Sequence, residues 1–265
     1  MIVACLKWTS AEGDDDRFTG VSPADQTALE VALQLGEAFD MEVVAVSAGP
    51  MGAEAVLRDA LACGAARAHR LDALRLSESR DVGAALADVV GDARVVVCGD
   101  HSLDRGSGSV PAYIAHGMRA AQALGLVSLD LTASSPSALS AVRRLDGGRR
   151  EIVSVPTPCV ISVEHSVASL RRGSLRRALA ADAAQIRVDG SSRTGVDRPA
   201  VVGQISPFRP RARVLPAPVG ADSLDRIRQL TDAGSAPSRG ETVHLPPREA
   251  AERIIATLRQ WGYLA

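Results

Sequence analysis

Short apolar runs alternate with helical periodicity throughout the first 131 residues, and this alternation constrains the fold more than any other feature. The expected strands are 2–7, 42–47, 66–71, 94–98 and 126–131. The expected helices are 23–39, 52–63, 81–90 and 110–124. Because parallel strands joined through helices need right-handed crossovers, the alternation predicts an α/β fold with a doubly wound, mostly parallel sheet of Rossmann-like type.

Beyond residue 131, strands follow one another without helices between them. Alternating runs over 138–145 and 149–155 flank Asp146-Gly147-Gly148, which is a hairpin turn signal, and residues 159–163 form one more apolar run. The sequence therefore predicts a β-hairpin extension of the sheet. Further helices are expected over 173–184 and, with an amphipathic pattern, over 247–262.

The stretch 189–247 is rich in Pro, Gly, Ser and Arg and has little periodicity. Structureless stretches of this length are uncommon inside a compact domain, because they cannot bury enough of their own surface. We therefore expect one α/β domain over residues 1–188. Residues 189–265 are expected to form a C-terminal arm with a terminal helix, ordered by contact with a partner chain.

The overall charge and composition exclude several functions. A formal net charge of −1 gives no reason to expect nucleic acid or an anionic membrane as a partner. No apolar run reaches the roughly 18 to 20 residues that cross a bilayer, and no charged segment precedes the first apolar run, so we expect a cytoplasmic protein without a transmembrane segment. Four widely separated cysteines offer neither a zinc site nor a CxxC motif, and no metal is expected.

The loop 99–110, with the sequence GDHSLDRGSGSV, carries the clearest functional signal. It follows the strand 94–98 and precedes a helix, and its small residues let backbone N–H groups approach an anion at the positive end of the helix dipole. The alternative is a plain surface turn. Loops at the carboxyl ends of parallel strands are where open α/β sheets bind ligands, and this position favours a phosphate site.

Motifs of catalysis do not occur. The first strand is not followed by Gly-x-Gly-x-x-Gly, and the sequence contains neither a P-loop Gly-Lys-Ser/Thr nor a Gly-x-Ser-x-Gly elbow. The run Asp14-Asp15-Asp16 is typical of a solvated loop, because consecutive carboxylates do not converge on one ion. The sequence therefore predicts a binding site without catalytic residues.

Six short stretches stand in a particular order: IVACLK at 2–7, SPAD at 22–25, VSAGP at 46–50, DALACGA at 59–65, the loop at 97–110, and RRGSL at 171–175. Taken together, over about residues 1–188, they resemble the β subunit of electron transfer flavoproteins, of which this chain looks like a divergent member. Asp100 stands where that family's loop has a lysine, and the sequence of the recognition segment at 168–172 differs from the sequence that is usual in the family.

The resemblance implies an electron carrier subunit rather than an enzyme, with an adenine nucleotide α-hydrolase-like fold. It implies a heterodimer with an electron transfer flavoprotein α subunit that holds most of the redox FAD, a dehydrogenase as electron donor, and AMP or a second FAD in the β-subunit site. The residues that it assigns to this nucleotide site are Cys5, Ser22, Ala24, Ala48, Gly99, Ser102, Asp104, Gly106, Ser107, Gly108, Ser109 and Val110. It assigns Arg171 and Leu175 to recognition of the redox partner, with Leu175 as the anchoring side chain.

Two other functions remain open from the sequence. One is a stand-alone nucleotide-binding or ATP-hydrolysing protein that uses the loop 104–110. The other is a purely structural subunit with an empty nucleotide site, for which the acidic Asp100 argues. Leu175 also has an alternative role as a core residue of its helix together with Leu179.

Overall fold

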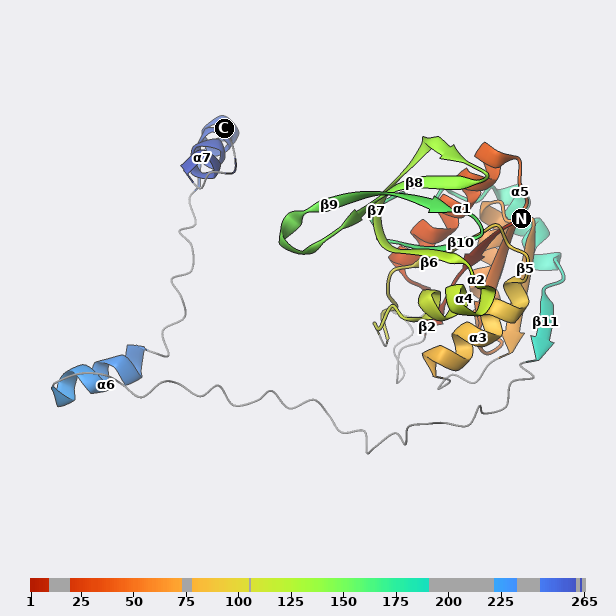
Figure 1. Ribbon diagram of the computed structural model, residues 1–265, viewed down its shortest axis with the longest axis horizontal. Helices are drawn as coiled ribbons and strands as arrows, with labels where there is room; N and C mark the ends of the chain where they lie inside the picture. The colour runs from red at the N-terminus through yellow and green to blue at the C-terminus, as the bar shows by residue number, and fades with distance from the viewer. Residues whose placement is uncertain are drawn as a thin grey trace. The chain divides into compact units, whose positions relative to one another are not determined.

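A nine-stranded sheet forms the centre of the computed structural model, which describes residues 1–9, 20–72, 78–104, 106–190, 222–232, 244–260 and 263. In spatial order its strands are β11 (Arg187–Gly190), β5 (Arg67–Asp72), β4 (Val43–Ala48), β1 (Ile2–Cys5), β6 (Val95–Gly99), β10 (Cys159–Val163), β7 (Ala121–Ser135), β8 (Ala138–Arg144) and β9 (Arg150–Pro156). All neighbours from β11 to β7 pair in parallel, and β8 and β9 add antiparallel strands. The predicted α/β class with a mostly parallel sheet is confirmed (Figure 1).

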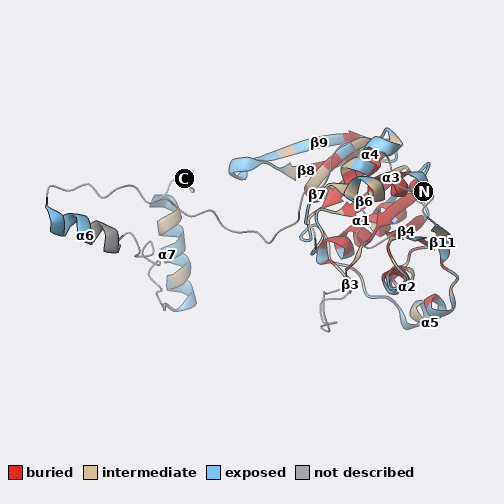
Figure 2. Ribbon diagram, turned by 90° about the horizontal axis from the view of Figure 1, so that it is seen from below, coloured by how far each residue is buried: buried red, intermediate tan, exposed pale blue. Residues whose placement is uncertain are grey.

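Two layers of helices cover this sheet. Helices α1 (Pro23–Phe39) and α2 (Ala53–Cys63) pack on one face, and α3 (Ser79–Val90) and α4 (Val110–Met118) pack on the other. Alternate residues of a strand therefore enter different cores: Ile2 and Ala4 contact the first pair of helices, and Val3 contacts the second pair. The central strands are buried on both faces (Figure 2), and their residues are accordingly almost all apolar.

Helix boundaries follow from the capping residues. Ser22 precedes Pro23, its Oγ accepts the backbone N–H of Asp25 at 3.0 Å, and the first turn of α1 is thereby closed. Gly64 ends α2 with a φ of 131°, a conformation that a Cβ would disfavour. Helix α5 (Leu175–Ala183) begins the same way as α1, since the Ser174 Oγ accepts the N–H of Arg177 at 3.2 Å, and it packs against α2.

The predicted boundary between the fourth helix and the next strand is wrong. The helix was expected to reach Leu124, but α4 ends at Met118, where Arg119 adopts a left-handed φ of 53°. Strand β7 then begins at Ala121 instead of Leu126 and pairs in parallel with β10. Helical and strand readings fit this alanine-rich stretch about equally, so the pairing partner decides its conformation.

The hairpin extension is confirmed. Strands β8 and β9 pair across the turn Asp146–Gly148, where Gly147 and Gly148 have φ values of 70° and 75°. Together with the far part of β7 they extend away from the helix-covered body (Figure 1). The last strand β9 is half exposed, and Ile152 on it is largely open to solvent.

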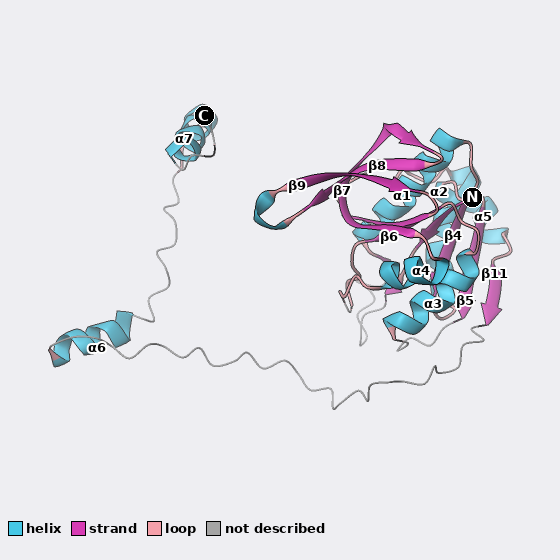
Figure 3. Cartoon of the chain, viewed as in Figure 1, coloured by secondary structure: helices cyan, strands magenta, loops and turns pink. Residues whose placement is uncertain are grey.

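The contacts within the chain divide it into two compact units, Met1–Ala200 and Val201–Ala265. The second unit contains α6 (Ser223–Asp232) and α7 (Pro247–Gln260), which Figure 3 marks as helices. Helix α6 lies within the stretch 189–247, where the sequence showed little periodicity and no helix was expected. Residues 191–221 and 233–243 lie outside the described part. A small second sheet pairs β2 (Trp8–Thr9) with β3 (Gly20–Val21). No helix in the described ranges is both long and apolar enough to cross a membrane.

Candidate functional site

The carboxyl ends of β1 and β6 lie side by side at the point where the strand order reverses. From β1 the chain continues through α1 to β4 on one side, whereas β6 adds to the opposite edge of β1. The segments that leave β1 and β6 lead to α1 and α4, which cover opposite faces of the sheet. Such a reversal opens a crevice between the two departing loops, and it is the usual ligand site of an open α/β sheet.

The loop between β6 and α4 has a backbone suited to a phosphate. Gly106 and Gly108 adopt φ values of 64° and 59°, and a Cβ on Gly108 would lie 2.5 Å from the carbonyl oxygen of Asp100. The backbone N–H groups at 107–110 have no hydrogen-bond partner among the described residues. They stand at the start of α4, so an anionic group bound there would meet unpaired donors and the positive end of the helix dipole. The residues present therefore fit a nucleotide phosphate.

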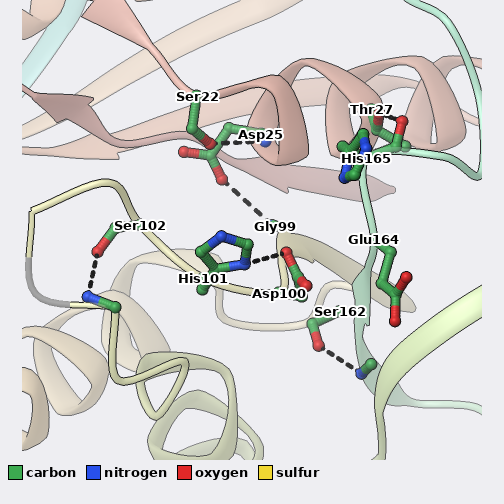
Figure 4. A network of polar contacts seen from close by, with 12 residues as sticks. Ser22, Asp25, Thr27, Gly99, Asp100, His101, Ser102, Ser162, Glu164 and His165 are labelled. Carbon is green, nitrogen blue, oxygen red and sulfur yellow. Dashed lines mark hydrogen bonds and ion pairs between the residues drawn. The ribbon is translucent and has the colours of Figure 1, made fainter. Parts of the chain in front are cut away.

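Asp25 holds the start of this loop against β1. Its Oδ1 accepts the N–H of Gly99 at 3.2 Å (Figure 4). Its Oδ2 accepts the N–H of Lys7 at 3.0 Å. The fit leaves no space for a side chain at Gly99, where a Cβ would come within 2.5 Å of Asp25 Oδ1. Burial raises the pKa of Asp25 to about 6, although the N–H groups of Lys7 and Gly99 favour its ionised form.

Lys7 brings a positive charge to the same loop. Its Nζ lies 2.6 and 2.7 Å from the two carboxylate oxygens of Asp104 and 3.4 Å from Ser102 Oγ. Further along the loop, His101 Nδ1 lies 2.8 Å from Asp100 Oδ1. Asp25 and Lys7 were not among the predicted site residues. Asp25 belongs to the motif SPAD and Lys7 to the motif IVACLK, and their place in these motifs was the sequence signal that could have identified them.

The structure gathers the predicted nucleotide residues at one end of the sheet. Cys5 and Cys98 are register neighbours on β1 and β6, and Ala48 ends the adjoining β4. Ser22 and Ala24 lie at the start of α1, whose first turn packs on Gly99. The remaining predicted residues lie in the loop or begin α4: Ser102, Asp104, Gly106, Ser107, Gly108, Ser109 and Val110.

The cysteines lie in the packed interior of the described structure. All four are free and buried. A hydrogen bond with Cys5, together with burial, raises the pKa of the Cys98 thiol well above its usual range. A neutral thiol is a weak nucleophile, so the pair acts as packing beneath the loop. No cluster of three or more metal-ligating side chains occurs in the described ranges.

Arg171 and Leu175, which were predicted for partner recognition, lie far in sequence from the residues predicted for the nucleotide site. No described hydrogen bond or ion pair joins the two groups. Arg171 forms ion pairs with Glu30, at 2.9 Å, and with Glu37, so it fastens its segment to α1. Leu175 begins α5 and is 76% exposed, and Leu179 one turn later is 63% exposed. Leu175 is therefore not a core residue of this unit, and the alternative role considered from the sequence is not supported.

Comparisons with known proteins agree with this geometry. The family model of the electron transfer flavoprotein domain matches residues 14–198. Protein FixA of Rhizobium meliloti (strain 1021) is 28% identical over 249 residues, covering 91% of this chain and 80% of the relative. The electron transfer flavoprotein subunit beta of Methylophilus methylotrophus is 32% identical over 163 residues, covering 57% of this chain and 60% of the relative. The chain therefore belongs to the electron transfer flavoprotein family, as a distant member of its β-subunit branch.

Proposed function

We propose that this chain is the β subunit of a heterodimeric electron transfer flavoprotein, which carries electrons from a dehydrogenase to a downstream acceptor. Its own site would hold an adenine nucleotide, either AMP or a second FAD. The observation that carries the proposal is the row of N–H groups at 107–110 that have no partner among the described residues, placed at the reversal point of the sheet in a chain of this family. The activity would be exercised in the cytoplasm.

Each part of the site has a role in this proposal. The N–H groups at 107–110 bind a phosphate, and the glycines at 106 and 108 let it approach the backbone. Asp25 fixes the loop's starting point against β1. Bound flavin supplies the electron-accepting ring, held mainly by the α subunit, while this chain supplies the nucleotide site and the partner-facing surfaces.

The described helices of the second unit offer surfaces for the α subunit. Leu224 and Ile227 on α6 are 51% and 56% exposed, and Ile254 and Ile255 on α7 are 59% and 42% exposed. Amphipathic helices with uncovered apolar faces gain stability when a partner covers them. This supports the proposal that residues 189–265 form an arm on the α subunit.

The exposed Leu175 supports a role in meeting the dehydrogenase. Arg172, Arg176 and Arg177 stand around it and are exposed. Complementary charge speeds the encounter with an acidic partner surface, and one leucine in a pocket sets the register without making the complex permanent. Arg171 belongs to the same segment through its attachment to α1.

Coexpression with an electron transfer flavoprotein α subunit tests the proposal. The expected product is a yellow one-to-one complex that releases AMP or more than one FAD per heterodimer on denaturation, as measured by absorbance and mass spectrometry. Gly108→Val should lose the β-site nucleotide, whereas Gly91→Val, which has a similar positive φ but no atom within 4 Å of a Cβ, should keep it. A monomer that hydrolyses ATP and ignores the α subunit would instead establish the stand-alone alternative.

A further inference from the structure

Lys7 is the only lysine of the chain, and the fold directs it to the nucleotide loop. Its backbone N–H donates to Asp25, and the same carboxylate accepts the N–H of Gly99, the residue at which the loop begins. The base of the lysine side chain is therefore held at a fixed place beside the loop. From there the flexible stem can present the ammonium group to more than one acceptor.

The ammonium group is held by a contact that is easy to exchange. Its partner Asp104 lies 97 positions away in the sequence, and both side chains are partly exposed, at 40% for Lys7 and 43% for Asp104. Solvent screens such a pair, so it contributes little to stability. Ser102 Oγ, at 3.4 Å from Nζ, lies at the edge of hydrogen-bond distance.

A cation beside the loop would strengthen its hold on a phosphate. Two of the loop's own side chains, Asp100 and Asp104, are acidic and one, Arg105, is basic, and the carboxylates oppose a phosphate bound nearby. The N–H groups at 107–110 supply partial positive charge but no full charge. Lys7 can supply that charge only when it is released from Asp104.

We propose that Lys7 is the phosphate-binding cation of this site and that Asp104 holds it in reserve until a nucleotide arrives. The inference rests on the proposed function, and it identifies the ion pair that would control how tightly the site binds a nucleotide. On binding, the ammonium group exchanges the carboxylate of Asp104 for a phosphate oxygen. Asp104 then acts as a competitor of the nucleotide and as a positioning residue for Lys7.

A double-mutant cycle with AMP as the titrated probe tests this exchange on the full chain by calorimetry. Lys7→Met should weaken AMP binding about tenfold, because a charge-assisted hydrogen bond is lost. Asp104→Asn should tighten AMP binding several-fold, because the lysine is released. In the double variant the gain from Asp104→Asn should be smaller than in the wild-type background, because no lysine is left to release and only the repulsion between carboxylate and phosphate is removed. An equal gain in both backgrounds would refute the exchange. Adenosine, which has no phosphate, is the matched ligand, and its affinity should not change in any variant.

The outcomes separate this inference from the function on which it rests. If the wild-type chain binds neither AMP nor FAD, the nucleotide site itself is refuted, and the inference is refuted with it. If AMP binds and Lys7→Met binds it equally well, only the role of Lys7 is wrong. If Asp104→Asn weakens AMP binding in both backgrounds, Asp104 contacts the nucleotide directly and is not a competitor. Circular dichroism spectra of all variants establish that each one is folded.

Discussion

Asp25 is a buried carboxyl group whose ionisation opposes folding. The free energy of unfolding should therefore depend measurably on pH. Its pKa rises from 3.8 to about 6 on folding, so the folded state favours the neutral form. Above pH 6 the group is charged in both states, and the shift corresponds to a cost of about 3 kcal/mol in the free energy of unfolding. That cost is relieved as the pH falls through 6, and it is gone below 3.8, where the group is neutral in both states.

The Asp25→Asn variant isolates this contribution. It removes the titration, and because its amide cannot accept both N–H groups, it also changes stability by an amount that does not depend on pH. Between about pH 7.5 and about pH 5, the wild-type protein should gain on the order of 1 kcal/mol of unfolding free energy relative to the variant. Urea unfolding followed by circular dichroism at both pH values measures this double difference, from which other titrating groups cancel.

Asp146→Asn is the control, because Asp146 is an exposed aspartate in the hairpin turn. The double difference for Asp25 should clearly exceed the one for Asp146. A double difference of zero, or one in which the wild type loses stability on acidification relative to Asp25→Asn, would mean that the two N–H groups outweigh burial. In that case Asp25 would be a stabilising anion.

Three further predictions follow from described contacts. Gly108→Val should weaken AMP binding at least about tenfold in calorimetry without unfolding the chain, because a β-branched residue is strained at a φ of 59° and blocks the phosphate approach. Leu175→Ala should slow electron transfer from the dehydrogenase several-fold in stopped-flow assays at unchanged thermal stability, because this side chain is 76% exposed; a lower melting temperature with unchanged transfer would contradict that role. Arg171→Ala should cost about 2 kcal/mol in urea unfolding at neutral pH, since it removes the guanidinium partner of the buried Glu30 carboxylate, whereas Arg172→Ala should cost little. Burial alone would raise the pKa of Glu30, but its hydrogen bonds with Arg171 lower it, so the wild-type advantage over Arg171→Ala should fade as the pH drops through that lowered pKa.

Local sequence patterns were sufficient to predict the strands of the sheet and most of the helices. Strand β10 is found over the predicted residues 159–163, because a short, mostly apolar run that directly follows Pro158 favours a buried strand. The hairpin at Asp146–Gly148 followed from its glycines. The boundary between α4 and β7 could not be predicted, because it depends on pairing with β10.

The loop was located from its small residues and its place after a strand, but its charged contacts were not predicted. The pairs Lys7 with Asp104 and Arg171 with Glu30 join positions 97 and 141 residues apart. Such contacts depend on how the elements pack, which periodicity does not report. The resemblance to a family supplied the residues proposed for the nucleotide site, whereas the role of Asp25 required the hydrogen bonds themselves.

Helix α1 joins two regions that would otherwise be independent. Its first turn carries Asp25 against the nucleotide loop, and Glu30 and Glu37 further along hold Arg171 and with it the segment that leads to Leu175. From Asp25 to Glu37 the helical rise amounts to about 18 Å. The spacing between the loop at 99–110 and the segment that leads to the exposed Leu175 is therefore set by a rigid helix. A substitution that tilts this helix would disturb both regions together, and their tolerance to mutation should be correlated.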